Sequence, residues 1–140
     1  MKTVLLAALV AVQALALTPE QQLTRDIFKQ LIEIDTADSA ANVTGAAEAM
    51  AQRLKAAGFA ESDIYVDGDN PHFKNLVVRY GGSGRAKPIL LLAHLDVVEA
   101  LRSDWSLDPF TFTEKEGYFY GRGTIDDKAQ AACWIANLIR

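Results

Sequence analysis

The chain has 140 residues, a formal net charge of −4, a hydrophobic content of 50% and a charged content of 23%. These values are typical of a globular protein and exclude a fibrous or intrinsically disordered chain, and the length allows one domain at most. The 14 Lys and Arg residues form no basic run, so we expect no nucleic-acid partner.

Residues 1–16 have the layout of a secretory signal peptide. A basic start at Lys2 precedes an apolar stretch over residues 4–15, and Ala14-Leu15-Ala16 is a small-x-small exit. The pattern predicts cleavage after Ala16, a secreted or periplasmic protein with no membrane contact after cleavage, and a folded part over residues 17–140. The alternative is an N-terminal helix packed in the core.

The only cysteine is Cys133, so no internal disulfide can form in an exported chain. Its sequence neighbours Ala132 and Trp134 are apolar and lie in a helical pattern. We therefore expect Cys133 to be a buried core residue rather than a nucleophile or metal ligand.

Three helices are predicted from periodicity and capping signals. Residues 18–21 (TPEQ) form a capping box with proline at the first helical position, and an apolar face carries this helix to about Asp35. Thr44 is expected to cap a second helix that stops at Gly58. The alanine-rich sequence from Lys128 onward predicts a third helix.

Strand signals lie between the second and third helices. Residues 64–66, 75–80 and 89–93 predict strands, and the glycine-rich residues between the last two predict a hairpin or tight crossover. The run 89–93 (ILLLA) has no polar alternation, which indicates a central strand buried on both faces. Residues 110–120 predict a further hairpin around Glu116-Gly117. The fold class is therefore α/β, with a mixed sheet flanked by helices.

Polar residues first interrupt this apolar run at His94 and Asp96. His94 would lie at the carboxyl end of the predicted strand, where open α/β sheets bind ligands. A zinc-binding histidine usually has its second ring nitrogen held by a carboxylate, and Asp96 is near enough to do so. Taken alone, the pattern favours a structural, hydrogen-bonded histidine over a metal ligand.

A second polar motif occupies residues 121–128 (GRGTIDDK), where a strand gives way to a helix. Its two glycines allow a sharp turn that presents a carboxylate. A phosphate-binding loop is disfavoured, because that pattern needs glycine at Asp126 and the two acids would repel a phosphate. Asp126 and Asp127 could instead simply cap the last helix.

Together these motifs resemble the M20 metallopeptidase family, which includes aminoacylases, carboxypeptidases, dipeptidases and desuccinylases. The resemblance runs over essentially the whole of residues 17–140. Its specific parts are residues 90–98 (LLLAHLDVV), 105–110 (WSLDPF) and 117–128 (GYFYGRGTIDDK). The sequence departs from the family pattern at Ala129, where glycine is usual.

The resemblance implies roles for individual residues. His94 would bind one zinc ion, Asp96 would be a catalytic-site residue that orients His94, and Asp126 would bridge two zinc ions. Asp127 would be a neighbour rather than a ligand, and the peptide bond between Asp126 and Asp127 would be cis. His72 matches no ligand position and reads as a surface residue.

The resemblance also implies an activity. The expected cofactors are two divalent metal ions, Zn²⁺ in first place, with Co²⁺ or Mn²⁺ also compatible with these ligand types. They would activate water for cleavage of a peptide or N-acyl amino-acid substrate. A base glutamate, further ligands and a small dimerisation domain, which would allow a homodimer, would follow Arg140. On this interpretation the chain is an incomplete catalytic domain and inactive alone.

Three alternatives stay open at this point. An N-acyl amino-acid deacylase would share the metal chemistry of a peptidase. A metal-free relative would keep the fold as a binding module, and a nucleotide-binding α/β protein would need a glycine-rich loop after its first strand.

Trp105 and Phe110, between the two motifs, are interpreted as packing anchors and not as substrate contacts.

Overall fold

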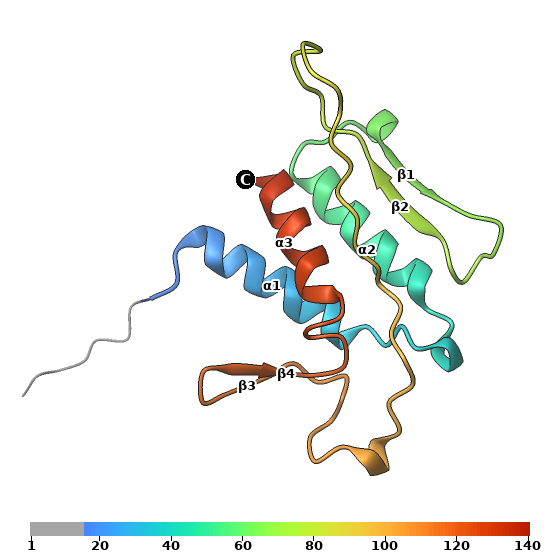
Figure 1. The fold of residues 1–140 in the computed structure, drawn as a ribbon, viewed down its shortest axis with the longest axis vertical. Coiled ribbons are helices and arrows are strands. Elements are labelled where there is room, and N and C mark those ends of the chain that lie inside the picture. Colours follow the sequence, from blue (N-terminus) through green and yellow to red (C-terminus); the bar gives the residue numbers. More distant parts are fainter. Residues whose placement is uncertain (1–15) are drawn as a thin grey trace, which may run out of the picture.

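The computed structural model describes residues 16–140 and shows a small mixed α/β arrangement (Figure 1). In chain order its elements are α1 (Pro19–Glu33), α2 (Val43–Ala56), β1 (Ile64–Asp67), β2 (Asn75–Val78), β3 (Thr113–Lys115), β4 (Tyr118–Tyr120) and α3 (Lys128–Ile139). The predicted signal peptide, apart from Ala16, lies outside the described residues. Within the described residues, no helix has the length and apolar character needed to cross a membrane.

Helix α1 begins at the predicted capping box. The Thr18 amide donates to Gln21 Oε1 at 2.9 Å, and the Gln21 amide donates to Thr18 Oγ1 at 3.2 Å. These reciprocal bonds satisfy two amides that a helix start leaves without partners. The buried face of α1 consists of Ile27, Phe28, Leu31 and Ile32.

Helices α1 and α3 pack together at the centre of the described structure (Figure 1). The face of α3 that is buried there consists of Lys128, Ala131, Ala132, Ile135 and Ala136. Cys133 is exposed, so the prediction of a buried cysteine is wrong. Side chains three, four and seven residues apart share a helix face, and Cys133 falls between those positions despite its apolar sequence neighbours.

Helix α2 starts differently from the prediction. Its N-cap is Asn42, which makes no side-chain cap bond, and Thr44 lies inside the helix. The Thr44 hydroxyl instead donates to Pro71 O at 2.7 Å and accepts from the Lys74 amide at 3.0 Å, which anchors the loop between β1 and β2. Gly58, with φ +95°, follows the end of the helix as predicted.

The described strands form two antiparallel pairs and not the predicted mixed sheet. β1 pairs with β2 in a register that places Ile64 opposite Val78, and β3 pairs with β4. The second pair is the predicted hairpin, and its turn residues Glu116 and Gly117 have φ of 55° and 81°. These positive values fit a two-residue hairpin turn.

Residues 89–93 do not form the predicted buried strand. They have no ladder partner in the described structure, and the side chains of residues 89–92 are between 46% and 86% exposed. Two side chains of α3 contact this run, because Gln130 Nε2 and Trp134 Nε1 both donate to Leu92 O. The sequence pattern is that of a strand covered on both faces, but the described residues do not supply that cover.

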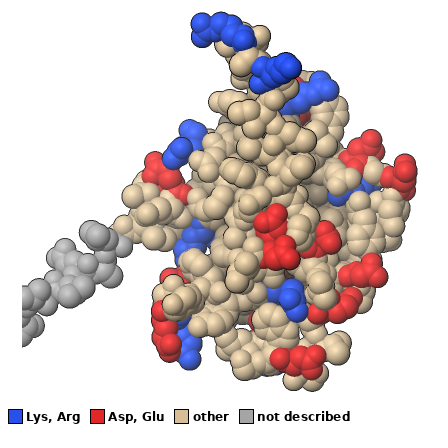
Figure 2. All heavy atoms as spheres, viewed as in Figure 1, with Lys and Arg blue, Asp and Glu red and all other residues tan. Residues whose placement is uncertain are grey.

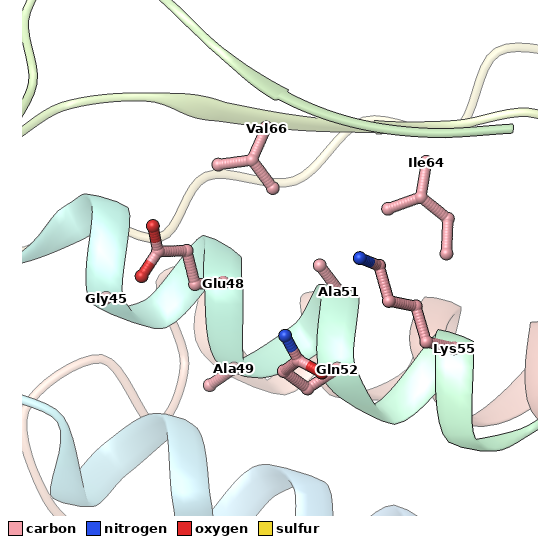
Figure 3. A pocket seen from close by; sticks show the side chains of 8 residues that line it. All are labelled: Gly45, Glu48, Ala49, Ala51, Gln52, Lys55, Ile64 and Val66. Carbon is pink, nitrogen blue, oxygen red and sulfur yellow. The ribbon is translucent and has the colours of Figure 1, made fainter. Parts of the chain in front are cut away.

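Two surface features stand apart from the motif residues. The loop over residues 81–88 projects from the molecule, and Figure 2 shows Lys and Arg side chains at its tip, where the sequence has Arg85 and Lys87. A hollow of about 530 Å³ lies between α2 and β1, with Glu48 and Lys55 of the helix facing Ile64 and Val66 (Figure 3). None of the predicted site residues lines this hollow.

Candidate functional site

His94 and Asp126, which are 32 residues apart in the chain, lie in direct contact. His94 Nε2 is 2.8 Å from Asp126 Oδ1. The side chains are 48% and 85% exposed, so both remain accessible to solvent. In Figure 2 acidic side chains gather near the middle of the face, over the start of α3. The two motifs therefore meet at one accessible place, as the sequence predicts.

The other ring nitrogen of His94 faces Asp96. His94 Nδ1 is 3.1 Å from the main-chain carbonyl oxygen of Asp96 and 3.4 Å from its carboxylate Oδ1. The carbonyl is thus the nearer partner, although the sequence prediction assigned this place to the carboxylate. Either oxygen can only accept, so Nδ1 must carry its proton to make a hydrogen bond.

Both contacts are satisfied together when His94 is protonated on both ring nitrogens or when a cation lies at Nε2. A neutral imidazole has one N–H, and the Asp96 carbonyl takes it at Nδ1. Nε2 then faces the Asp126 carboxylate with a lone pair, unless it binds a second proton or a metal cation. The hydrogen bond to Asp126 raises the pKa of His94 above its ordinary value of 6.5, against a smaller opposing effect of partial burial.

Asp127 lies beside the pair but does not contact the imidazole. It is the N-cap residue of α3, yet its side chain makes no cap bond, so the simple helix-cap alternative is not observed. Instead Asp127 Oδ2 accepts from the His94 main-chain amide at 3.3 Å. The peptide bond between Asp126 and Asp127 is cis, as the resemblance implied.

The two glycines before Asp126 allow the turn to approach the His94 segment closely. Gly123 has φ +88°, a region that L-residues with side chains rarely adopt. A Cβ at Gly123 would lie 2.9 Å from Lys128 Cδ and 3.0 Å from Val97 Cγ1. A Cβ at Gly121 would lie 2.6 Å from Ile32 Cγ2. Both positions therefore need glycine for close packing.

A shallow hollow of about 270 Å³ opens at this point. Besides His94, Asp96 and Asp126, its lining includes Trp105 and Arg122. The Arg122 guanidinium lies over the Trp105 ring at 5.1 Å, and Arg122 Nη2 donates to Glu99 O at 3.3 Å. Trp105 thus forms part of the wall of the hollow, whereas the sequence analysis interpreted it only as a packing anchor.

Sequence reasoning missed two further residues that contact these motifs. Thr36 is fully buried, and its hydroxyl donates to Leu95 O at 2.6 Å. Lys128 is also fully buried, and its Nζ donates to Ile34 O at 2.8 Å. The sequence carries no signal for Thr36, which reads as one residue of a polar loop. His72, by contrast, is exposed, as predicted.

The donors at this site fit a divalent cation such as zinc. An imidazole nitrogen and a carboxylate oxygen 2.8 Å apart are both common zinc ligands and can contact one ion. Within residues 16–140, no group of three or more His, Cys, Asp or Glu side chains is arranged to hold a metal. Structural and catalytic zinc sites usually have at least three protein ligands, so these residues offer part of a site.

Comparisons with known proteins place the same motifs in one family. Residues 90–140 match the model of peptidase family M20/M25/M40. A succinyl-diaminopimelate desuccinylase of Methylorubrum populi is 37% identical over 95 residues, which are 66% of this chain and 24% of that protein. An N-fatty-acyl-amino acid synthase/hydrolase of Xenopus tropicalis is 45% identical over 56 residues, which are 40% of this chain and 11% of that protein.

The chain thus spans about a quarter of the length of the first relative and about a tenth of the second. The matched stretch contains His94, Asp96 and Asp126 together with the glycine turn that presents Asp126. By these comparisons, residues 90–140 of the chain belong to the peptidase family M20/M25/M40.

Proposed function

We propose that this chain contributes metal ligands to a hydrolase that cleaves amide or peptide bonds. His94 and Asp126 are the residues that would hold the divalent ions, and Asp96 is the proposed residue that orients His94. The observation that carries the proposal is the placement of His94 between two acceptors, because it leaves Nε2 facing a carboxylate where a cation fits.

The residues of the chain would have separate tasks in this reaction. Divalent ions bound at the site would supply the Lewis acidity that amide hydrolysis needs. The Asp96 carbonyl lies 3.1 Å from Nδ1 and would accept its proton, which would leave the Nε2 lone pair free for a metal ion. Asp126 is the more exposed of the pair, so its carboxylate would remain accessible to a bound ion.

The first experiment measures zinc binding by the chain itself. We expect Zn²⁺ to shift the imidazole NMR signals of His94 and not those of His72, the only other histidine. Asp126→Asn should abolish this shift, whereas Asp38→Asn, in a separate short 3₁₀ turn, should retain it. Zinc that leaves the His94 signals unchanged would contradict the metal site.

The second experiment measures amide hydrolysis by the polypeptide that the complete open reading frame encodes. Zinc-loaded protein should cleave a dipeptide or an N-acyl amino acid, and His94→Ala should abolish turnover. The 140-residue chain alone should show no turnover, since its described residues supply fewer than three ligands. Turnover by this chain alone would show that His94 and Asp126 suffice.

A second candidate is an N-acyl amino-acid deacylase with the same metal chemistry. Two apolar side chains lie on the rim of the hollow, Val98 at 77% exposed and Ile125 at 89% exposed. Exposed apolar groups beside a binding site suit an apolar acyl chain. The relative from Xenopus tropicalis is named for N-fatty-acyl-amino acids. Faster cleavage of long-chain than of short-chain N-acyl substrates would favour this candidate over a peptidase.

We also propose that the protein is exported. The support is the sequence of residues 1–16, with its basic start, apolar middle and small-x-small exit. N-terminal sequencing of secreted or periplasmic protein should find Leu17 as the first residue. Intracellular protein that retains Met1 would contradict this proposal.

A further inference from the structure

The short segment over residues 34–37 connects the end of α1 to the rest of the chain and lies under both site motifs. Thr36 is fully buried and Ala37 is almost so. A buried segment outside regular structure must find partners for its polar groups, because an unpaired buried polar group costs about 1–3 kcal/mol. Its partners are main-chain groups of Leu95 and Val97, which follow His94, and the side chain of Lys128, which follows Asp127.

On one side the segment holds the His94 motif. The Thr36 hydroxyl donates to Leu95 O at 2.6 Å, and the Val97 amide donates to Thr36 O at 3.3 Å. Ala37 and Val97 also form a parallel β-bridge. Leu95 lies between His94 and Asp96 in the chain, so these contacts fix the main chain from which both side chains project.

On the other side the segment holds the Asp126 motif. Lys128 Nζ donates to Ile34 O at 2.8 Å, and the Lys128 stem packs under Gly123. Burial of an ammonium group is unfavourable, and the Lys128 side chain is fully buried. An apolar side chain would fill the same space without that penalty, which implies that the hydrogen bond has a positional role.

We propose that residues 34–37 set the separation between His94 and Asp126, with Thr36 and Lys128 as the positioning residues. Thr36 binds the segment to the His94 motif, and Lys128 binds it to the Asp126 motif. The segment thereby fixes the distance between the two motifs. The inference rests on the proposed metal site for its significance, but the geometry that it concerns exists without metal. A simple stabilising role for Thr36 and Lys128 is the competing explanation.

Two near-isosteric variants separate these explanations. Thr36→Val removes the hydroxyl and keeps the shape, and Lys128→Met removes the ammonium and keeps the stem. Lys128→Met should stay folded, because replacing a buried charge by an apolar group of similar volume is commonly neutral or stabilising. Thr36→Ser restores the hydroxyl, and Thr24→Val removes a comparable hydroxyl bond, to Glu20 O, elsewhere on α1.

The readout is the imidazole NMR spectrum of the metal-free chain at a temperature where circular dichroism shows every variant folded. In Thr36→Val and Lys128→Met the His94 signals should move toward their position in Asp126→Asn, while the His72 signals stay unchanged. Thr36→Ser and Thr24→Val should retain the wild-type His94 signals. Folded Thr36→Val and Lys128→Met proteins with wild-type His94 signals would overturn the proposal.

Zinc titration gives a second readout. Loss of a residue that orients a metal ligand lowers metal affinity by about 10-fold to 100-fold, and we expect that loss in both variants. If the wild-type chain binds no zinc, the proposed function fails, yet the metal-free spectra still decide whether the segment positions His94. If Lys128→Met unfolds, the comparison of Thr36→Val with Thr36→Ser decides the proposal.

Discussion

His94 is a single side chain with an acceptor at each ring nitrogen, and this arrangement determines its titration. The hydrogen bond to Asp126 is the largest cause that raises the pKa of His94 above 6.5. A raised pKa in the folded state means that the proton on His94 stabilises the fold fully below pH 6.5. That contribution is lost as the pH rises through the folded-state pKa.

The first prediction concerns the removal of the Asp126 charge. In Asp126→Asn the pKa of His94 should fall, because the amide is neutral and holds the imidazolium less strongly. An NMR titration of the metal-free chain measures this directly, and Asp104→Asn, in a separate 3₁₀ turn, serves as the charge-matched control. An unchanged pKa of His94 in Asp126→Asn would contradict the contact.

A second prediction concerns Lys128 and the pH dependence of stability. Its pKa is lowered from 10.5 to about 8, chiefly by burial. The unfolded chain therefore binds more protons between pH 8 and 10.5, and the free energy of unfolding should rise across that range. The difference of 2.5 pH units corresponds to about 3 kcal/mol.

Urea unfolding at pH 7.5 and pH 10 measures this effect, with Lys128→Met as the comparison. The variant lacks the titrating group, so its free energy of unfolding should rise less between the two pH values. An equal rise in both proteins would show that Lys128 is not responsible.

The proximity of His94 and Asp126 could be predicted from the sequence, because both belong to recognisable motifs. His94 and Asp126 were expected at one place because each follows a motif with known spacing, and the structure brings them to 2.8 Å. Thr36 and Lys128 could not be assigned in this way. Their partners are main-chain carbonyl groups 59 and 94 residues away. Every residue has such a group, so the residue types do not reveal these partners.

Among the elements, the glycine turn before α3 depends most on close packing. Gly123 and Gly58 both have positive φ, at +88° and +95°, but only Gly123 has neighbours within 4 Å of an added Cβ. Alanine at either position carries the backbone penalty of about 1 kcal/mol. Alanine at Gly123 must also displace Lys128 and Val97, which adds about 1–3 kcal/mol.

The third prediction is therefore that Gly123→Ala destabilises the fold more than Gly58→Ala. Thermal unfolding of the two variants measures the difference, because their backbone penalties are similar. Equal losses of stability would show that the turn can relax and that close packing at Gly123 is unimportant.

Two local signals predicted elements correctly, whereas the cap signal at Thr44 and the signals that depend on distant neighbours did not. The capping box at Thr18 and the hairpin turn at Glu116 are set by residues three or fewer apart, and both are observed. Burial of residues 89–93 and of Cys133 depends on what packs beside them. Apolar sequence shows that a residue tolerates burial, but the neighbours decide whether burial occurs.

For the whole molecule, the exposed run over residues 89–92 is the feature that favours aggregation. Four consecutive aliphatic side chains lie on an extended segment whose backbone has no ladder partner in the described structure. Such segments pair with other chains and promote aggregation. We therefore expect the 140-residue chain to self-associate at high concentration.

The fourth prediction follows from this exposure. Leu90→Lys should reduce self-association, since a charge within an edge segment opposes pairing. Leu101→Lys is the matched control, because Leu101 is also exposed but lies outside the run. Light scattering across a concentration series measures both variants. Equal scattering by Leu90→Lys and the unsubstituted chain would exclude the run as the contact.

The projecting loop over residues 81–88 divides the molecule in an unexpected way. An added Cβ at Gly81, Gly82 or Gly84 meets nothing within 4 Å, so a chain break there disturbs no packing. The piece before the break carries Thr36, and the piece after it carries both His94 and Asp126. The second piece therefore contains the histidine–aspartate pair without residues 34–37, which contact both of its motifs. Splitting the gene at this loop would thus yield two parts whose reassembly restores the contacts of Thr36 with Leu95 and of Ile34 with Lys128.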